Sequence, residues 1–254
     1  MKQSKISSIL SILSAAILLL VGNAKGDETS LNSNFFFDLG IGFNEKDRQS
    51  IYLDEYSVLI GYSKEESIRF ASDAIRKAYR FFSVFGYSEQ YPLKIIFQKE
   101  VAIETQNGDL VYVYGKLGKG GIIYLTEWNE PLLFKHNTYD FEMCEDLYES
   151  IIIHEIAHFI VENICRDKID LVLTEYVAYA AQFSQMKPSL RNGILDRQLI
   201  NAFNTDEIYI EIMFMNPLAF AVKSYLHFRN THGRFLRKIL DGTHLNHGKL
   251  EDLR

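Results

Sequence analysis

The segment from Ile151 to Val161 (IIIHEIAHFIV) is apolar except at three positions, His154, Glu155 and His158. A helix that is apolar on every side belongs in the interior of a protein. Burying two imidazoles and a carboxylate costs several kcal/mol unless each group finds a partner. The chain must therefore fold so that a partner reaches these groups, and a divalent metal ion would serve all of them.

The spacing of the two histidines favours such an ion. Residues four apart are neighbours on one helix face, so His154 and His158 can direct their nitrogens at a single metal. Glu155 lies beside the first histidine, from where it reaches a water at the metal but not a ligand position. A chance match to this pattern would usually fall on an amphipathic or irregular stretch, whereas this one falls in the most apolar helix of the mature chain.

A catalytic zinc needs a third protein ligand and an open position for water. The second apolar helix expected, Leu171 to Phe183 (LVLTEYVAYAAQF), contains one carboxylate, Glu175. A short polar turn joins the two helices, so they should run antiparallel, and His158 and Glu175 each lie roughly 8 to 10 Å from that turn. Glu175 is the preferred third ligand. Asp170 is the alternative, although its position favours a helix N-cap.

The two cysteines, Cys144 and Cys165, are too few for a cysteine-rich zinc module, so a metal site in this chain has to use histidine and carboxylate. They flank the first apolar helix, which would separate them by about 25 Å. A disulfide needs Cα atoms about 6 Å apart. We expect no bond between them.

These motifs resemble a known family. HEIAH followed by a glutamate in a second helix (TEYVAYAAQ) is similar to the gluzincin branch of zinc metallopeptidases. The resemblance implies a zincin-like fold, with zinc held by the two motif histidines and the glutamate. It also implies that the strand GIIYLT (121–126) borders the cleft and pairs with an extended peptide. The glutamate stands in a Thr-Glu-Tyr context in place of the familiar Asn-Glu or Glu-Gly pair, so no subfamily is assigned.

The chain as a whole predicts an α+β fold in a single zincin-like domain, residues 25–254. An α/β lobe with a mixed sheet and a helix (25–140) should precede a mainly helical lobe (141–254) that carries the HExxH helix. In the first lobe, β-branched and aromatic stretches predict strands and helical spacing predicts one helix. The expected elements are strands in 50–61 and 91–98, a hairpin of 110–115 with 121–126, and helices at 63–85, 141–164, 170–184, 217–229 and 234–240.

Residues 1–24 are typical of a secretory signal peptide. Lys2 and Lys5 precede an apolar stretch, and the small residues Gly22 and Ala24 favour cleavage after Ala24. An uncleaved membrane anchor is the alternative. We expect a periplasmic or secreted protein with no stable membrane insertion after cleavage. The formal charge of -6 argues against a nucleic-acid partner.

The function predicted from these features is hydrolysis of peptide bonds by one zinc ion, with a peptide or protein as substrate. Zinc would lower the pKa of a water towards ~7, and Glu155 would take its proton as general base and pass it to the leaving amine. Two alternatives remain, a zinc hydrolase of non-peptide amides and a catalytically silent binding module. A silent zinc site would normally be closed by a fourth protein ligand and needs no general base.

A second electrophile usually stabilises the oxyanion in such a reaction, and a tyrosine or histidine suits that role. The candidates within reach of the motif in sequence are Tyr176, Tyr179, Tyr209, His227 and His232. Packed aromatics and surface histidines are commoner than catalytic ones. The sequence alone does not choose among them.

Overall fold

The structure is a computed structural model that describes residues 49–104, 110–118, 120–134, 138–166, 169–198, 200–208 and 210–243. The predicted signal peptide (1–24) and Tyr209 lie outside the described residues. None of the helices in the described ranges is both long and apolar enough to cross a membrane.

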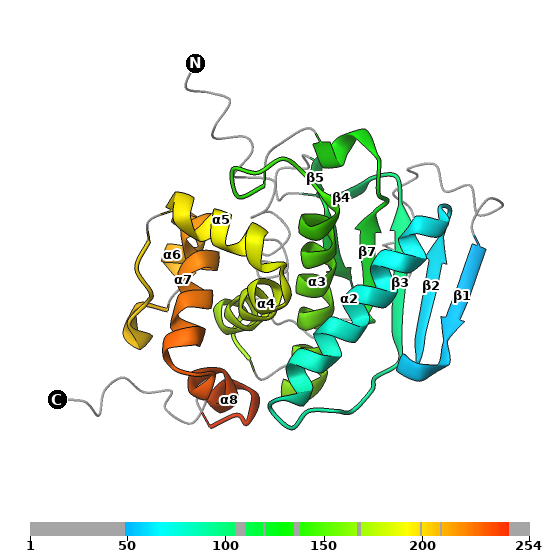
Figure 1. Ribbon diagram of the computed structural model, residues 1–254. Helices are drawn as coiled ribbons and strands as arrows, with labels where there is room; N and C mark the ends of the chain where they lie inside the picture. Colours follow the sequence, from blue (N-terminus) through cyan, green and yellow to red (C-terminus); the bar gives the residue numbers. More distant parts are fainter. Residues whose placement is uncertain are drawn as a thin grey trace, which may run out of the picture.

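A mixed sheet forms one side of the molecule (Figure 1). Its five strands, counted over the described residues, follow the order β1-β2-β3-β7-β6. The central strands β2, β3 and β7 are parallel, and the outer strands β1 and β6 are antiparallel to their neighbours. The bounds are β1 (Gln49–Leu53), β2 (Val58–Tyr62), β3 (Leu93–Gln98), β6 (Gly115–Gly118) and β7 (Ile122–Thr126).

The helices lie on one side of this sheet. α2 packs against β2 and α3, α3 packs against α4, and α4 packs against α7; Figure 1 shows this succession from right to left. The bounds are α2 (Glu65–Ser83), α3 (Glu145–Cys165), α4 (Leu171–Gln185), α5 (Pro188–Gln198), α6 (Ile210–Met215), α7 (Pro217–Asn230) and α8 (Arg234–Leu240). The predicted α+β organisation, a mixed sheet followed by a helical part, is confirmed.

Because α3 has the sheet and α2 on one side and α4 on the other, its apolar residues are buried nearly all round.

The five helices expected from periodicity are all present, with bounds shifted by up to four residues. Two α-helices in the described part of the chain, α5 and α6, were not predicted. α5 contains Gly193, which reads as a breaker but lies where a Cβ would come within 2.9 Å of the Phe141 ring. α6 has six residues, which are too few for helical periodicity to be recognised in the sequence.

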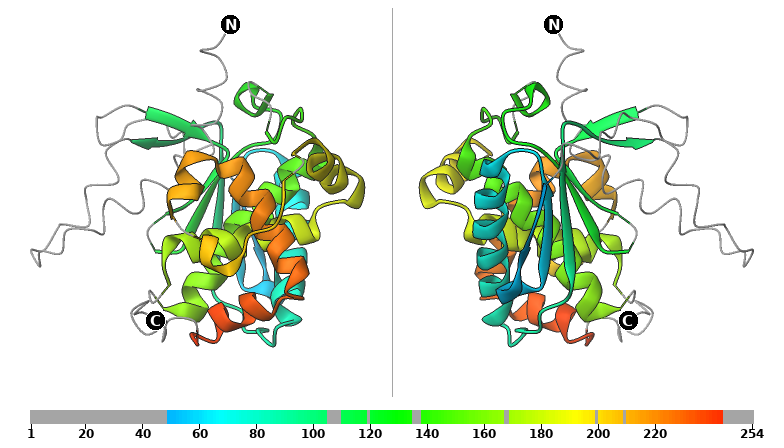
Figure 2. Two further views of the ribbon diagram at one scale, coloured as in Figure 1. Left: turned by 90° about the vertical axis from the view of Figure 1, so that its left-hand side faces the viewer. Right: turned by 90° about the vertical axis from the view of Figure 1, so that its right-hand side faces the viewer.

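The predicted hairpin is wrong in its pairing. Residues 110–115 do not pair with 121–126: β5 (Leu110–Val113) pairs with β4 (Val101–Glu104), and β6 pairs with β7. Figure 2 shows β4 and β5 as a separate ribbon that projects from the main sheet. The predicted hairpin left residues 116–120 as its connecting loop, but residues 116–118 belong to β6. Its glycines allow close packing, because a Cβ on Gly115 would lie 2.8 Å from the Glu155 side chain.

The strand expected to border the cleft is therefore an internal strand. β7 lies between β3 and β6, whereas β6 has a partner on one side only among the described strands.

Cys144 and Cys165 lie at opposite ends of α3 and are free, as predicted.

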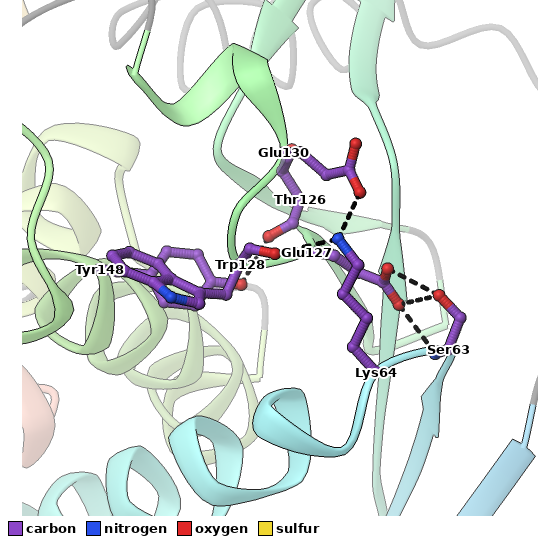
Figure 3. Close-up of polar contacts among 7 residues, drawn as sticks. All are labelled: Ser63, Lys64, Thr126, Glu127, Trp128, Glu130 and Tyr148. Carbon is purple, nitrogen blue, oxygen red and sulfur yellow. Dashed lines mark hydrogen bonds and ion pairs between the residues drawn. The ribbon is translucent and has the colours of Figure 1, made fainter.

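A buried carboxylate ties the start of α2 to the end of β7 (Figure 3). Glu127 is 1 % exposed and accepts hydrogen bonds from the backbone N–H and the hydroxyl of Ser63, at 2.8 and 2.6 Å. Beside it, Lys64 donates to the Trp128 carbonyl and to the Glu130 carboxylate. These contacts hold the segment that leads from the sheet into α3.

We predict that Glu127→Ala lowers the free energy of unfolding by about 2 kcal/mol, because it removes two hydrogen bonds to a charged acceptor. Glu130→Ala is the matched control. It removes a partly exposed ion pair with Lys64 and should lower the free energy by less than about 1 kcal/mol. Urea unfolding of the purified variants measures both values, and equal losses would contradict this account.

Candidate metal centre

The first two ligands expected from the sequence lie on one face of α3, and the third lies on α4. Arg166, with φ of 49°, ends α3 in the left-handed conformation, and Asp170 stands at the N-cap of α4. The short connection makes the two helices neighbours. Asp170 is exposed and outside the metal group, so the preference for Glu175 over Asp170 agrees with the structure, although the Asp170 side chain forms no capping hydrogen bond.

The ligand atoms of His154, His158 and Glu175 converge on one point. The two histidine Nε2 atoms are 2.9 Å apart, and they lie 3.4 and 3.3 Å from the Glu175 carboxylate oxygens. A tetrahedral zinc ion with bonds of about 2.0–2.1 Å would place its ligand atoms about 3.3–3.4 Å apart. The three groups therefore fit a zinc ion with only small movements of the imidazoles.

These groups are almost completely removed from solvent. The histidine side chains are each 12 % exposed, and the Glu175 side chain is 5 % exposed. The Nδ1 atom of His154 is buried without a hydrogen bond to any described residue. Three polar side chains in such a setting are costly unless a common partner binds them, and a metal ion is a partner for all three at once.

The charges of the group are strongly coupled. Burial alone would raise the pKa of Glu175, but His158 and His154 outweigh it and hold the pKa well below its usual range. Burial would lower the pKa of His158, but the Glu175 carboxylate raises it to about 9. At neutral pH the pair therefore exists as a glutamate and an imidazolium ion, and a metal has to displace a proton in order to bind.

Glu155 belongs to the same site but not to the ligand group. Its side chain points towards β6, where Gly115 packs against it. Burial raises the pKa of Glu155 in spite of the nearby histidines. A carboxylate with a raised pKa beside a metal site is suited to accept and return a proton.

A stripe of polar residues continues the site along both helices. Ser150 lies one turn before His154 on α3, and Gln182 lies two turns after Glu175 on α4. The Gln182 amide donates to the Ser150 hydroxyl at 3.2 Å and accepts from the Tyr139 hydroxyl at 3.1 Å. These three residues were not among the sequence candidates. Ser150 and Gln182 could have been found as lone polar residues at helical spacing from the ligands.

The structure distinguishes among the residues considered as the electrophile that stabilises the oxyanion. Tyr179 lies against His154, with ring centroids 4.5 Å apart. Tyr176 faces the other way and its hydroxyl is 2.8 Å from His227 Nδ1. His227 is bonded on its second nitrogen to Thr205, and His232 is exposed on the surface. Of the described candidates, Tyr179 alone contacts a ligand residue.

Comparison with known proteins adds a family but no activity. Neither the curated proteins nor the solved structures contain a match to the chain. The model of a family of unknown function, DUF6639, matches residues 60–248, which span the chain from β2 to beyond α8 and include the whole candidate site. Because this match covers well over half of the sequence, the chain belongs to the DUF6639 family.

Proposed function

We propose that this protein is an exported zinc metallopeptidase of the gluzincin type. The observation that carries the proposal is the convergence of His154, His158 and Glu175 in a nearly buried site, with Glu155 beside them. Two imidazoles and one carboxylate are a catalytic ligand set, because they leave a coordination position open. Among the described residues, no further His, Cys, Asp or Glu joins the group as a fourth ligand.

Zinc bound at this site would polarise a carbonyl group and lower the pKa of a water molecule. The residues of the chain divide the remaining work. His154, His158 and Glu175 position the ion, and Glu155 accepts a proton from the attacking water and returns it to the leaving amine. The raised pKa of Glu155 suits both steps, because the carboxyl group must gain the proton and lose it again in one turnover.

The edge strand β6 supports a peptide substrate. β6 runs beside α3, it has a free edge among the described strands, and its Gly115 lies against the Glu155 side chain. An extended peptide can add to such an edge through backbone hydrogen bonds, which would carry its carbonyl groups past the metal site. A zincin-like fold would have this arrangement of sheet edge and HExxH helix. Export to the periplasm or outside the cell follows from the signal-peptide pattern of residues 1–24.

We expect the purified chain to contain one zinc ion, and Glu175→Ala to lose it. Elemental analysis measures the content, and hydrolysis of a fluorogenic peptide library with and without 1,10-phenanthroline measures the activity. Zinc without peptide hydrolysis would favour the silent binding module, and hydrolysis restricted to non-peptide amides would favour the other alternative. Absence of stoichiometric zinc would remove the proposal.

Zinc affinity should depend on pH with a defined sign. Zinc binds the neutral imidazole, and His158 in the metal-free protein has a pKa of about 9. Binding below that pH releases a proton, so we expect the affinity to rise about tenfold per pH unit between about pH 6.5 and 8.5 and then to level off. Competition with a chromophoric chelator measures this slope. A constant affinity across the range would contradict the assignment of His158 as a ligand.

Glu155→Gln should separate metal binding from turnover. The amide keeps the shape of the side chain but cannot take up the proton, so we expect full zinc content and a loss of kcat of about 1000-fold. The control is Glu149→Gln on the same helix, because Glu149 forms an ion pair with Lys77 of α2 outside the site. If Glu155→Gln kept its kcat with zinc bound, the mechanism would be wrong.

A further inference from the structure

Three buried tyrosines lie on or beside α4, the helix that carries Glu175. They are Tyr139, which precedes α3, and Tyr176 and Tyr179 on α4, and each is at most 5 % exposed. A buried tyrosine hydroxyl normally has a hydrogen-bond partner, because leaving it without one loses the bond it made to water. Which partner each hydroxyl has therefore indicates which of them is available to a substrate.

Two of the three hydroxyls already have partners within the protein. The Tyr139 hydroxyl donates to the Gln182 side chain at 3.1 Å, and the Tyr176 hydroxyl lies 2.8 Å from His227 Nδ1. Tyr139 is also held in place by its backbone. It stands in a two-residue turn with Asp140, both at positive φ (57° and 62°), a conformation that is unfavourable for a tyrosine.

Two side chains of α5 hold that turn in place. The Arg197 guanidinium lies over the Phe141 ring, 3.7 Å from its centroid, and donates to the Asp140 carbonyl; Gln198 donates to the Asp140 carboxylate. The Tyr139 hydroxyl is thus committed to Gln182 by a turn that has little freedom to release it. Neither Tyr139 nor Tyr176 is available as a donor to a bound molecule.

The Tyr179 hydroxyl is different. No described residue forms a hydrogen bond with it. Tyr179 follows Glu175 by one helical turn, so both side chains project from the same face of α4 towards α3. Its ring packs between His154, at 4.5 Å, and Phe220, at 6.1 Å, which leaves the ring little room to move.

We propose that Tyr179 is a catalytic residue that donates a hydrogen bond to the oxygen of the scissile carbonyl as that oxygen gains negative charge. This assignment rests on the proposed function. The ring is held between His154 and Phe220 before substrate arrives, so little reorganisation of the donor opposes the reaction. The phenol keeps its proton throughout, so no bond to Tyr179 forms or breaks.

The test is Tyr179→Phe in the full chain, which removes the oxygen and keeps the ring contact with His154. We expect unchanged zinc content and melting temperature, a KM within about threefold, and a kcat lower by about 100- to 1000-fold, the effect of losing one oxyanion donor. Tyr179→His, which restores a ring donor, should recover part of the kcat. The matched control is Tyr176→Phe on the same helix, which should leave kcat within about threefold.

A second readout does not depend on turnover. Acetohydroxamate binding to the cobalt-substituted protein, followed by the visible spectrum, should weaken about tenfold in Tyr179→Phe, the equivalent of one hydrogen bond, and should not change in Tyr176→Phe. A wild-type chain that binds no metal would refute the proposed function. An active wild type with unchanged kcat and hydroxamate affinity in Tyr179→Phe would overturn only this assignment. Loss of zinc or of folding in Tyr179→Phe would overturn it as well, in favour of a packing role.

Discussion

The contact between α3 and α4 places two imidazoles and a carboxylate where solvent hardly reaches them. Without a bound partner, these three groups are poor hydrogen-bond partners for one another. The Nε2 atoms of His154 and His158 face each other at 2.9 Å, so at most one proton can lie between them, while Glu175 has to balance whatever charge results. A buried ion pair rarely adds net stability compared with apolar packing. The group is therefore better explained by what it can bind than by what it contributes to folding.

The surrounding fold follows from the need to bury α3. A helix that is apolar all round has to be covered on every side, and the sheet with α2 covers one side while α4 covers the other. Where β6 crosses the helix, Gly115 removes the side chain that would collide with Glu155. This close approach brings a sheet edge next to the carboxylate. The same packing that hides the helix from water thus places the edge strand β6 beside its polar face.

The sequence predicted the parts of this arrangement that depend on local spacing. The positions of the two histidines, the apolar second helix and the short turn between them determine which side chains can meet, so Glu175 could be selected before the fold was known. Strand pairing could not be predicted in the same way. The segment 115–118 contains two glycines and therefore looks like a loop. Nothing in the local sequence shows that Gly115 makes room for Glu155 of α3, about 40 residues further along the chain. Tyr139 was missed for a related reason, since an irregular turn has no periodicity that reveals where its side chain points.

Tyr176 and Tyr179 illustrate which features helical spacing predicts and which depend on tertiary packing. Each residue of an α-helix turns the direction of the side chain by about 100°, so Tyr179 returns to the face of Glu175 while Tyr176 turns away from it. That difference is readable in the sequence, and it agrees with the contacts, because Tyr176 meets His227 of α7 and Tyr179 meets His154 of α3. Which hydroxyl is already bonded is not readable there. It depends on His227, which α7 brings to the Tyr176 hydroxyl, whereas no described residue brings a partner to the Tyr179 hydroxyl.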